Sequence, residues 1–230
     1  GGLVIGAYCE GKLIGFQYSF PGFNGQSAYL CSHILGIDEQ FRNKGIGEKL
    51  KLAQREEALK LGYSLITWTY DPLESVNGYL NIAKLGGVCS TYIANCYGEM
   101  EDLLNSGIPS DRFLVEWHID KKETTDSSGG GMPLDFVMEN SLIQWDTIEK
   151  GLPVPSFTRP LPEQECETAF VALPKDFRTI RVTNIQAANE WRMKTRDIFT
   201  GLFQQGWQVT DFMKNSMTEI PVQFYVLSRK

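Results

Sequence analysis

Histidine is scarce in this chain of 230 residues, which contains only His33 and His118. Chemistry that depends on several histidines is therefore nearly excluded. The five cysteines are scattered singly at positions 9, 31, 89, 96 and 166, with no C-x-x-C pair and no histidine at ligand spacing. This pattern predicts no metal site. Four of the five cysteines lie in apolar, strand-like surroundings, where a reduced thiol behaves as a small hydrophobe. We therefore expect a cytoplasmic protein.

Long apolar runs are also missing. No stretch approaches the ~20 apolar residues that a membrane-spanning helix requires, and no basic segment followed by an apolar one marks a secretion signal. The formal net charge is −6, whereas nucleic-acid binders usually present a basic surface that neutralises phosphates. We therefore expect neither a nucleic acid nor a membrane as a partner. A local basic cluster for a small phosphorylated molecule stays compatible with this charge.

The first 119 residues alternate β-rich runs with two helical segments. This order predicts a mixed α/β fold, with a mostly antiparallel sheet and flanking helices. The predicted strands are 3–9, 12–20, 28–37, 63–70, 88–97 and 113–119, and the predicted helices are 46–61 and 75–85. In the first helix, Ile46, Leu50, Ala53 and Leu61 share one face, and Glu57 falls on it too. The chain opens with a Gly-Gly pair rather than Met and enters a strand at once, so we expect a fragment whose first elements are missing.

A polar, glycine-rich segment without periodicity follows at 121–133 and predicts a flexible linker. Beyond it, the pattern predicts strands at 168–173, 207–213 and 222–227 and an amphipathic helix at 184–205. The predicted organisation is therefore a core at 1–120, a linker at 121–133 and a C-terminal α/β extension at 134–230.

The strongest local motif lies between a predicted strand and a predicted helix. It reads R-x-x-G-x-G and consists of Arg42, Asn43, Lys44, Gly45, Ile46 and Gly47. An anion can bind the unpaired N–H groups at a helix N-terminus, and glycines let it approach the backbone. Lys49 and Lys51 add positive charge to this end of the helix. The simpler alternative is a strand–turn–helix connection with glycines for geometry, because the motif is neither a P-loop nor a GxGxxG loop.

In this context the chain resembles the GNAT superfamily of acyltransferases over about residues 1–119. The run 42–47 matches the family motif that binds the CoA pyrophosphate, and Lys84-Leu85-Gly86 matches the K-x-G ending of a later helix. A narrower likeness to a bacterial group of predicted GNAT acyltransferases rests on Ser32-His33, Gln54-Arg55, Thr67-Trp68-Thr69-Tyr70-Asp71-Pro72-Leu73, Asn81, Lys84-Leu85-Gly86, Tyr97-Gly98 and Asp111-Arg112-Phe113. The resemblance implies a GNAT-like fold, acetyl-CoA or another acyl-CoA as co-substrate, and no metal.

The resemblance also implies where the acyl-CoA is held. In the family it enters between splayed central strands, where backbone N–H groups stabilise the oxyanion. Here the candidates are the N–H groups of Leu35, Gly36 and Ile37. Asn77 and Asn81 are candidates to bond the pantetheine arm, with helix capping and solvation as the alternative. Lys84 belongs to the K-x-G ending.

Proton transfer needs a base for the amine and an acid for the thiolate. His33 is the best-placed base, because it lies on the central strand and imidazole exchanges a proton readily near neutral pH. A structural histidine is the simpler alternative. Glu39 and Asp71 could act through water, and Asp71 could instead cap the turn after its strand.

The acid is less well defined. Many family members carry a tyrosine two residues before the lysine of K-x-G, and here that position is Ile82. Tyr79, one turn earlier, is the first replacement candidate, with Tyr92 and Tyr97 as others. Core packing is the simpler role for each tyrosine.

For the acceptor, Arg192 and Arg196 lie four residues apart, on one face of the predicted C-terminal helix. Two guanidinium groups suit the bidentate capture of a carboxylate, although a solvated helix face is the alternative. The sequence thus predicts an acyl-CoA-dependent N-acyltransferase that passes an acetyl or succinyl group to a small-molecule amine, such as an amino acid. A non-catalytic acyl-CoA-binding module and a protein N-acetyltransferase are the alternatives, and a homodimer stays open.

Overall fold

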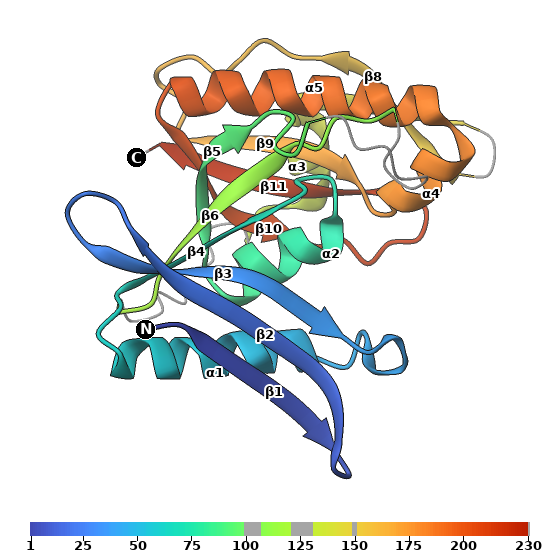
Figure 1. The fold of residues 1–230 in the computed structure, drawn as a ribbon. Coiled ribbons are helices and arrows are strands. Elements are labelled where there is room, and N and C mark those ends of the chain that lie inside the picture. The colour runs from blue at the N-terminus through green and yellow to red at the C-terminus, as the bar shows by residue number, and fades with distance from the viewer. Residues whose placement is uncertain (99–106, 121–130, 149–150, 230) are drawn as a thin grey trace. The chain divides into compact units, whose positions relative to one another are not determined.

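The computed structural model describes residues 1–98, 107–120, 131–148 and 151–229. It confirms a mixed α/β fold with a mostly antiparallel sheet (Figure 1). Two compact units make up the chain, Gly1–Trp68 with Glu116–Thr124, and Thr69–Val115 with Thr125–Lys230. The predicted boundary at residue 120 stays a prediction, and most of the predicted linker at 121–133 lies outside the described residues.

The first unit is built on antiparallel hairpins. β1 (Leu3–Cys9), β2 (Lys12–Phe23) and β3 (Ala28–Ile37) pair in chain order. Two further strands, β4 (Leu65–Tyr70) and β6 (Arg112–His118), run through both units. β3 pairs with β4 in parallel, and this is the pairing that requires a helical crossover between the strands.

That crossover is α1 (Ile46–Lys60), which follows the short 3-10 helix η1 (Glu39–Phe41) and packs against β1, β2 and β3. Its buried side chains are Leu50, Lys51, Gln54 and Ala58. The predicted apolar stripe was wrong at Leu61, which is 50% exposed. Residues 50, 54 and 58 are four apart and align along one side of a helix, and this side carries two polar residues that the apolar pattern did not include.

The second unit contains a sheet in the order β4-β6-β5-β10-β11-β9. Its remaining strands are β5 (Val88–Ile93), β9 (Thr168–Pro174), β10 (Trp207–Met213) and β11 (Val222–Arg229). The long helix α5 (Ile185–Gln204) follows α4 (Phe177–Thr183) and packs against β5, β9 and β10, as the orange ribbon in Figure 1 shows. The predicted strands at 168–173, 207–213 and 222–227 and the predicted helix match these elements closely, whereas β5 ends at Ile93, four residues before the predicted end.

The connection between β4 and β5 is not one regular helix. A single turn of α-helix, α2 (Ser75–Gly78), continues as a π-helix, η2 (Tyr79–Lys84), where the sequence predicted one helix from 75 to 85. Gly78 makes a close approach possible, because a Cβ there would lie 2.7 Å from both Phe212 and the Tyr225 hydroxyl. Helices of the π type are rare and often occur at functional sites.

Three further elements precede β9 and were not predicted. α3 (Leu134–Glu139) leads into a separate two-stranded sheet of β7 (Ile143–Thr147) and β8 (Pro153–Thr158). β8 packs against α5, where the Trp191 indole donates a hydrogen bond to the Pro153 carbonyl at 2.9 Å. Prolines at the first and third positions of β8, Pro153 and Pro155, weaken the strand pattern in sequence, because proline is usually confined to edge strands.

The core of the second unit is aromatic. The Phe113 ring lies edge-on to Phe199 at 4.7 Å and to Tyr225 at 5.5 Å between centroids. The Tyr70 and Tyr225 hydroxyls lie 3.1 Å apart in the same core, and burial raises the pKa of both phenols. Along the described chain, every helix is too short or too polar to cross a bilayer.

Candidate functional site

The two central strands of the first unit pair over a short length. β3 pairs with β4 through Leu30 with Ile66 and Cys31 with Thr67. On its other edge β3 pairs with β2 along its whole length, from Ala28 to Ile37. The predicted oxyanion donors, Leu35, Gly36 and Ile37, therefore lie on the part of β3 that follows the last registered pair with β4.

His33 occupies a β-bulge on β3. Ser19 pairs with Ser32 and Tyr18 pairs with Ile34, so His33 is the extra residue of the strand. Its exposed ring lies 5.5 Å from the Phe20 ring and 6.3 Å from the Tyr18 ring. Bulges frequently redirect a side chain near a functional site. The predicted base is therefore accessible and lies beside two aromatic rings.

The predicted phosphate turn joins β3 to α1. The turn begins at Asp38, whose Oδ1 accepts a hydrogen bond from the backbone N–H of Gln40 at 3.0 Å. Asn43 and Gly45 both adopt positive φ, at 60° and 76°. The first helical hydrogen bond runs from the N–H of Lys49 to the Gly45 carbonyl, so the N–H groups of residues 46–48 precede the hydrogen-bonded ladder. The turn thus opens a helix with the geometry that binds anions.

The backbone conformation at position 45 requires a glycine, and the position faces open space. A side chain at φ +76° is strained, and a Cβ built there meets no described atom within 4 Å. Arg42 and Lys44 flank it and are exposed, and Lys49 is exposed one turn into α1. Lys44 rests over the Phe41 ring at 5.0 Å. The open backbone and these three cations fit a pyrophosphate group.

Lys51 does not belong to this cationic group, contrary to the sequence prediction. It is only 3% exposed. Its Nζ donates to the Ser32 hydroxyl at 2.8 Å and lies 3.5 Å from the centroid of a Trp68 ring. Burial lowers the pKa of the Lys51 amine to about 7, an effect that the nearby Cys31 partly opposes. The position of Lys51 on α1 explains why it is buried while Lys49 is exposed, since residue 51 falls on the same side of the helix as Leu50 and Gln54.

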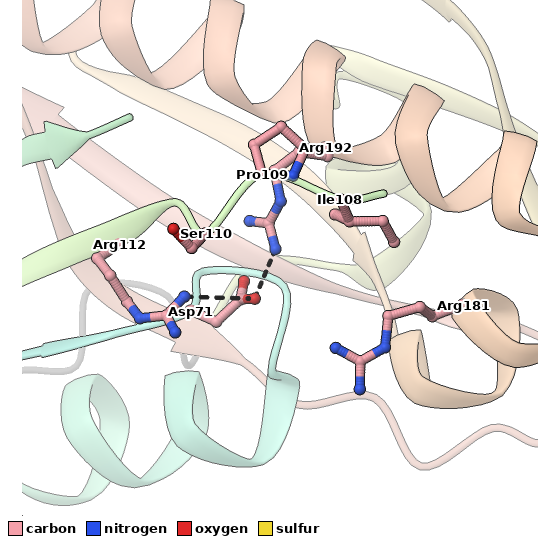
Figure 2. Close-up of a pocket in the computed structure, with 7 residues that line it drawn as sticks. All are labelled: Asp71, Ile108, Pro109, Ser110, Arg112, Arg181 and Arg192. Carbon is pink, nitrogen blue, oxygen red and sulfur yellow. Dashed lines mark hydrogen bonds and ion pairs between the residues drawn. The ribbon is translucent and has the colours of Figure 1, made fainter. Parts of the chain in front are cut away.

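In the second unit, Asp71 is the centre of an ion-pair cluster (Figure 2). Its Oδ2 accepts from Nη2 of Arg192 at 2.5 Å and lies 3.8 Å from Nη1 of Arg112. Its Oδ1 accepts the N–H of Leu73 at 2.9 Å. Asp71 therefore has the turn-capping contact that was its simpler alternative, and it also holds two guanidinium groups.

The second predicted arginine pairs with a different carboxylate. Arg196 donates through Nε and Nη2 to both oxygens of Asp111, at 2.8 and 2.6 Å. Tyr92 donates its hydroxyl to the same carboxylate at 2.7 Å, and the N–H of Asn95 donates at 2.8 Å. Arg192 and Arg196 thus each bind a carboxylate of this chain, and the two do not meet at one carboxylate.

The other predicted residues of the second unit lie on α2 and η2. Asn81 is buried, Asn77 is half-buried and Lys84 is exposed. The Tyr79 ring lies 6.4 Å from Phe212, with the Lys214 ammonium 5.0 Å from its centroid. Ile82, which stands where many members of the resembled family carry a tyrosine, is 2% exposed.

Two groups at these sites escaped the sequence interpretation. Arg112 was noted only as part of a family motif, although it meets Asp71. Lys51 was grouped with the surface cations. A helical wheel drawn through Leu50 and Gln54 could have indicated its burial. Nothing in the sequence spacing links residue 112 to residue 71.

Within the described residues, no group of three His, Cys, Asp or Glu side chains could hold a metal ion.

Comparison with known proteins gave structural similarities only. No family model matches the chain, and no curated protein matches it. A GNAT family acetyltransferase from Elizabethkingia anophelis with acetyl-CoA bound is 20% identical, with a TM-score of 0.45, over 51% of this chain and 76% of that one. Aminoglycoside 6'-acetyltransferase type Ii is 19% identical, with a TM-score of 0.42, over 53% and 71%. The ribosomal-protein-S18-alanine N-acetyltransferase from Escherichia coli is 16% identical, with a TM-score of 0.44, over 54% and 73%.

Proposed function

We propose that this chain is an acyl-CoA-dependent N-acyltransferase that transfers an acetyl or succinyl group to the amine of a small molecule, with amino acids as candidate acceptors. The observation that carries the proposal is the turn before α1. Gly45 holds a left-handed conformation there with open space at its Cβ position, between the exposed side chains of Arg42 and Lys44. Anions bind at such helix N-termini, and the family motif for the CoA pyrophosphate has this sequence.

The chemical step needs a base and an oxyanion site. The amine nitrogen of the acceptor attacks the thioester carbonyl, a C–N bond forms, the C–S bond breaks, and the thiolate takes up a proton. We assign the proton leaving the amine to His33, and the oxyanion to the backbone N–H groups between Leu35 and Ile37. The roles of Tyr79 and Asp71 in proton transfer, and of Asn77, Asn81 and Lys84 in holding the pantetheine arm, stay predictions.

One observation favours a second candidate function. The family's usual acid position carries Ile82, whose side chain is buried and cannot donate a proton. A module that binds acyl-CoA without turnover is therefore the alternative. It shares the phosphate turn with the enzyme and differs from it only in the chemical step.

Binding is tested first, by calorimetry of the whole chain with acetyl-CoA. Gly45→Trp is compared with Gly62→Trp, a matched control just beyond the other end of α1. Gly62 also has positive φ, at 86°, and open space at its Cβ position, so both variants carry similar backbone strain. We expect the native chain and Gly62→Trp to bind and Gly45→Trp not to bind. Absence of binding to the folded native chain would refute the proposal.

Turnover is tested second, by thiol release from acetyl-CoA and succinyl-CoA with free amino acids, other small amines and a peptide amine as acceptors. Release with a small amine supports the proposed enzyme. Binding without release under all conditions supports the non-catalytic module. Release with the peptide alone would replace the small acceptor by a protein terminus.

A further inference from the structure

We infer that a small pocket beside Asp71 in the second unit binds the carboxylate group of a small organic acid. The pocket is lined by Asp71, Ile108, Pro109, Ser110, Arg112, Arg181 and Arg192. All of these residues belong to the second unit. The inference uses no part of the phosphate turn, and it therefore does not depend on acyl transfer.

Four separate segments bring the lining together, as Figure 2 shows. Asp71 follows β4, and Arg112 begins β6 after the stretch 108–110. Arg181 comes from α4 and Arg192 from α5. Arg112 and Arg192 both point at Asp71, while Arg181 approaches from the side of the pocket opposite Arg112. Three guanidinium groups that are far apart in sequence thus line one small space.

Arg192 supplies the strongest observation. Its side chain is 1% exposed, and only its Nη2 bonds to Asp71. In the described part of the chain its Nε and Nη1 atoms have no hydrogen-bond partner. Buried guanidinium donors without an acceptor are unfavourable, and a bound oxyanion would supply the acceptor that they need.

The charges of the lining point the same way. The lining contains three guanidinium groups and one carboxylate. Oδ2 of Asp71 already faces both Arg112 and Arg192. Asp111, which precedes Arg112 in sequence, is bonded to Arg196, Tyr92 and Asn95. Arg112 and Arg192 thus share one carboxylate oxygen, and an anion from outside the chain would offset the positive charge that Asp71 alone does not balance.

The lining favours a carboxylate over inorganic phosphate. Planar guanidinium groups match the geometry of carboxylates and of phosphates alike. The pocket is small, however, with a volume of about 20 Å³, and it admits the planar end of a carboxylate more readily than a tetrahedral phosphate. The inferred ligand is a short carboxylic acid whose charged end meets the arginines.

The test is calorimetry of the whole chain with acetate and with succinate, with inorganic phosphate and chloride as comparison anions at matched ionic strength. We expect one carboxylate bound per chain, more tightly than phosphate or chloride. Arg181→Gln and Arg112→Gln should each weaken binding by about tenfold or more, since a charge-assisted hydrogen bond is lost. Arg178→Gln is the matched control, because it lies on the same helix as Arg181 but is exposed and pairs with Glu74 at 2.9 Å. Its affinity should equal that of the native chain.

A direct readout at Arg192 completes the test. The side-chain Nε–H resonance of Arg192, assigned by its loss in Arg192→Lys, should shift on titration with acetate. If Arg192→Lys does not fold, the Arg181 and Arg112 variants decide alone. The inference is overturned if no carboxylate binds to the folded native chain, if phosphate binds more tightly, or if Arg178→Gln weakens binding as much as Arg181→Gln. None of these results involves acyl-CoA, so failure here and failure of the proposed function are distinguishable.

Discussion

The amine nitrogen of Lys51 lies 3.5 Å from the centroid of a Trp68 ring. The same nitrogen donates to Ser32, and the whole side chain is buried against the sheet. A cation is attracted to the face of an aromatic ring, yet burial removes it from water and favours the neutral amine. In Lys51 the second effect is the larger, and it lowers the pKa from 10.5 to about 7.

The first prediction concerns the stability of the Lys51→Met variant as a function of pH. Between pH 7 and 10.5 the unfolded chain holds a proton on Lys51 that the folded chain has released. The free energy of unfolding therefore gains up to about 1.4 kcal/mol per pH unit from this group in that window. Below pH 7 both states are protonated and the gain is absent. Urea unfolding should show Lys51→Met more stable than the native chain near pH 7, with the advantage shrinking as pH rises.

Lys49→Met, two residues earlier, provides the control for this measurement. Lys49 is exposed, so the free energy of unfolding of Lys49→Met, plotted against pH, should run parallel to that of the native chain. A Lys51→Met curve that is also parallel would show that the amine keeps its proton in the folded state.

The second prediction concerns His33 as the base. His33→Gln should lower kcat for the proposed acyl transfer by about a hundredfold or more, the usual contribution of a general base. Affinity for acetyl-CoA should be unchanged, because the phosphate turn is intact. His118→Gln is the natural control, since His118 is the other histidine of the chain and is exposed. Equal activities of the two variants would assign His33 a structural role.

The third prediction concerns the buried carboxylate of Asp111. Burial raises the pKa of the Asp111 carboxyl, whereas hydrogen bonds from Arg196, Asn95 and Tyr92 lower it. The hydrogen bonds have the larger effect, so the pKa lies below its ordinary value of 3.8. Its contribution to stability is therefore present above that pH and is lost as the pH falls through the folded-state value. Asp111→Asn should cost ~3–5 kcal/mol at neutral pH, because it leaves a guanidinium without its partner.

The exposed Asp197, next to Arg196 on α5, serves as the comparison. Asp197→Asn should change the free energy of unfolding by less than about 0.5 kcal/mol. Similar losses in the two variants, measured by urea unfolding, would contradict a special role for Asp111.

The fourth prediction concerns the aromatic core. Phe113 is fully buried and contacts both Phe199 and Tyr225. Phe113→Ala should destabilise the chain by ~3–5 kcal/mol, the range for deleting a buried aromatic ring. Phe157→Ala removes a ring that is 50% exposed and should cost much less. Thermal and urea unfolding of the two variants side by side would test the difference.

Much of the fold follows from local patterns in the sequence. The hairpin at Glu10-Gly11, the strand–turn–helix at 37–46 and the long helix near 185–204 each have a strong local signal, and the structure has each of them. β7 and β8 were missed because they are short strands outside the main sheet, and β8 also contains two prolines. The π-helix was missed because a change of helix type leaves no mark in hydrophobic spacing.

The sites were less predictable than the fold, since they depend on contacts between distant residues. The spacing of Arg192 and Arg196 placed them on one helix face, and both lie there. Their partners, Asp71 and Asp111, are 121 and 85 residues away in sequence. No single-sequence pattern pairs groups over such separations, so the internal carboxylates could not be distinguished from those of a ligand.

The bulge at His33 separates the proposed base from the residues of β3 that pack against the helix. Before it, Ser32 faces α1, where Lys51 bonds to it. After it, Ile37 lies on the side of Leu50, as the crowding at Gly15 shows. Residue 33 stands outside the two-residue alternation, so it can be exchanged without changing which neighbours face the helix. Evolution can therefore change the side chain at position 33 while leaving the packing beneath it unchanged.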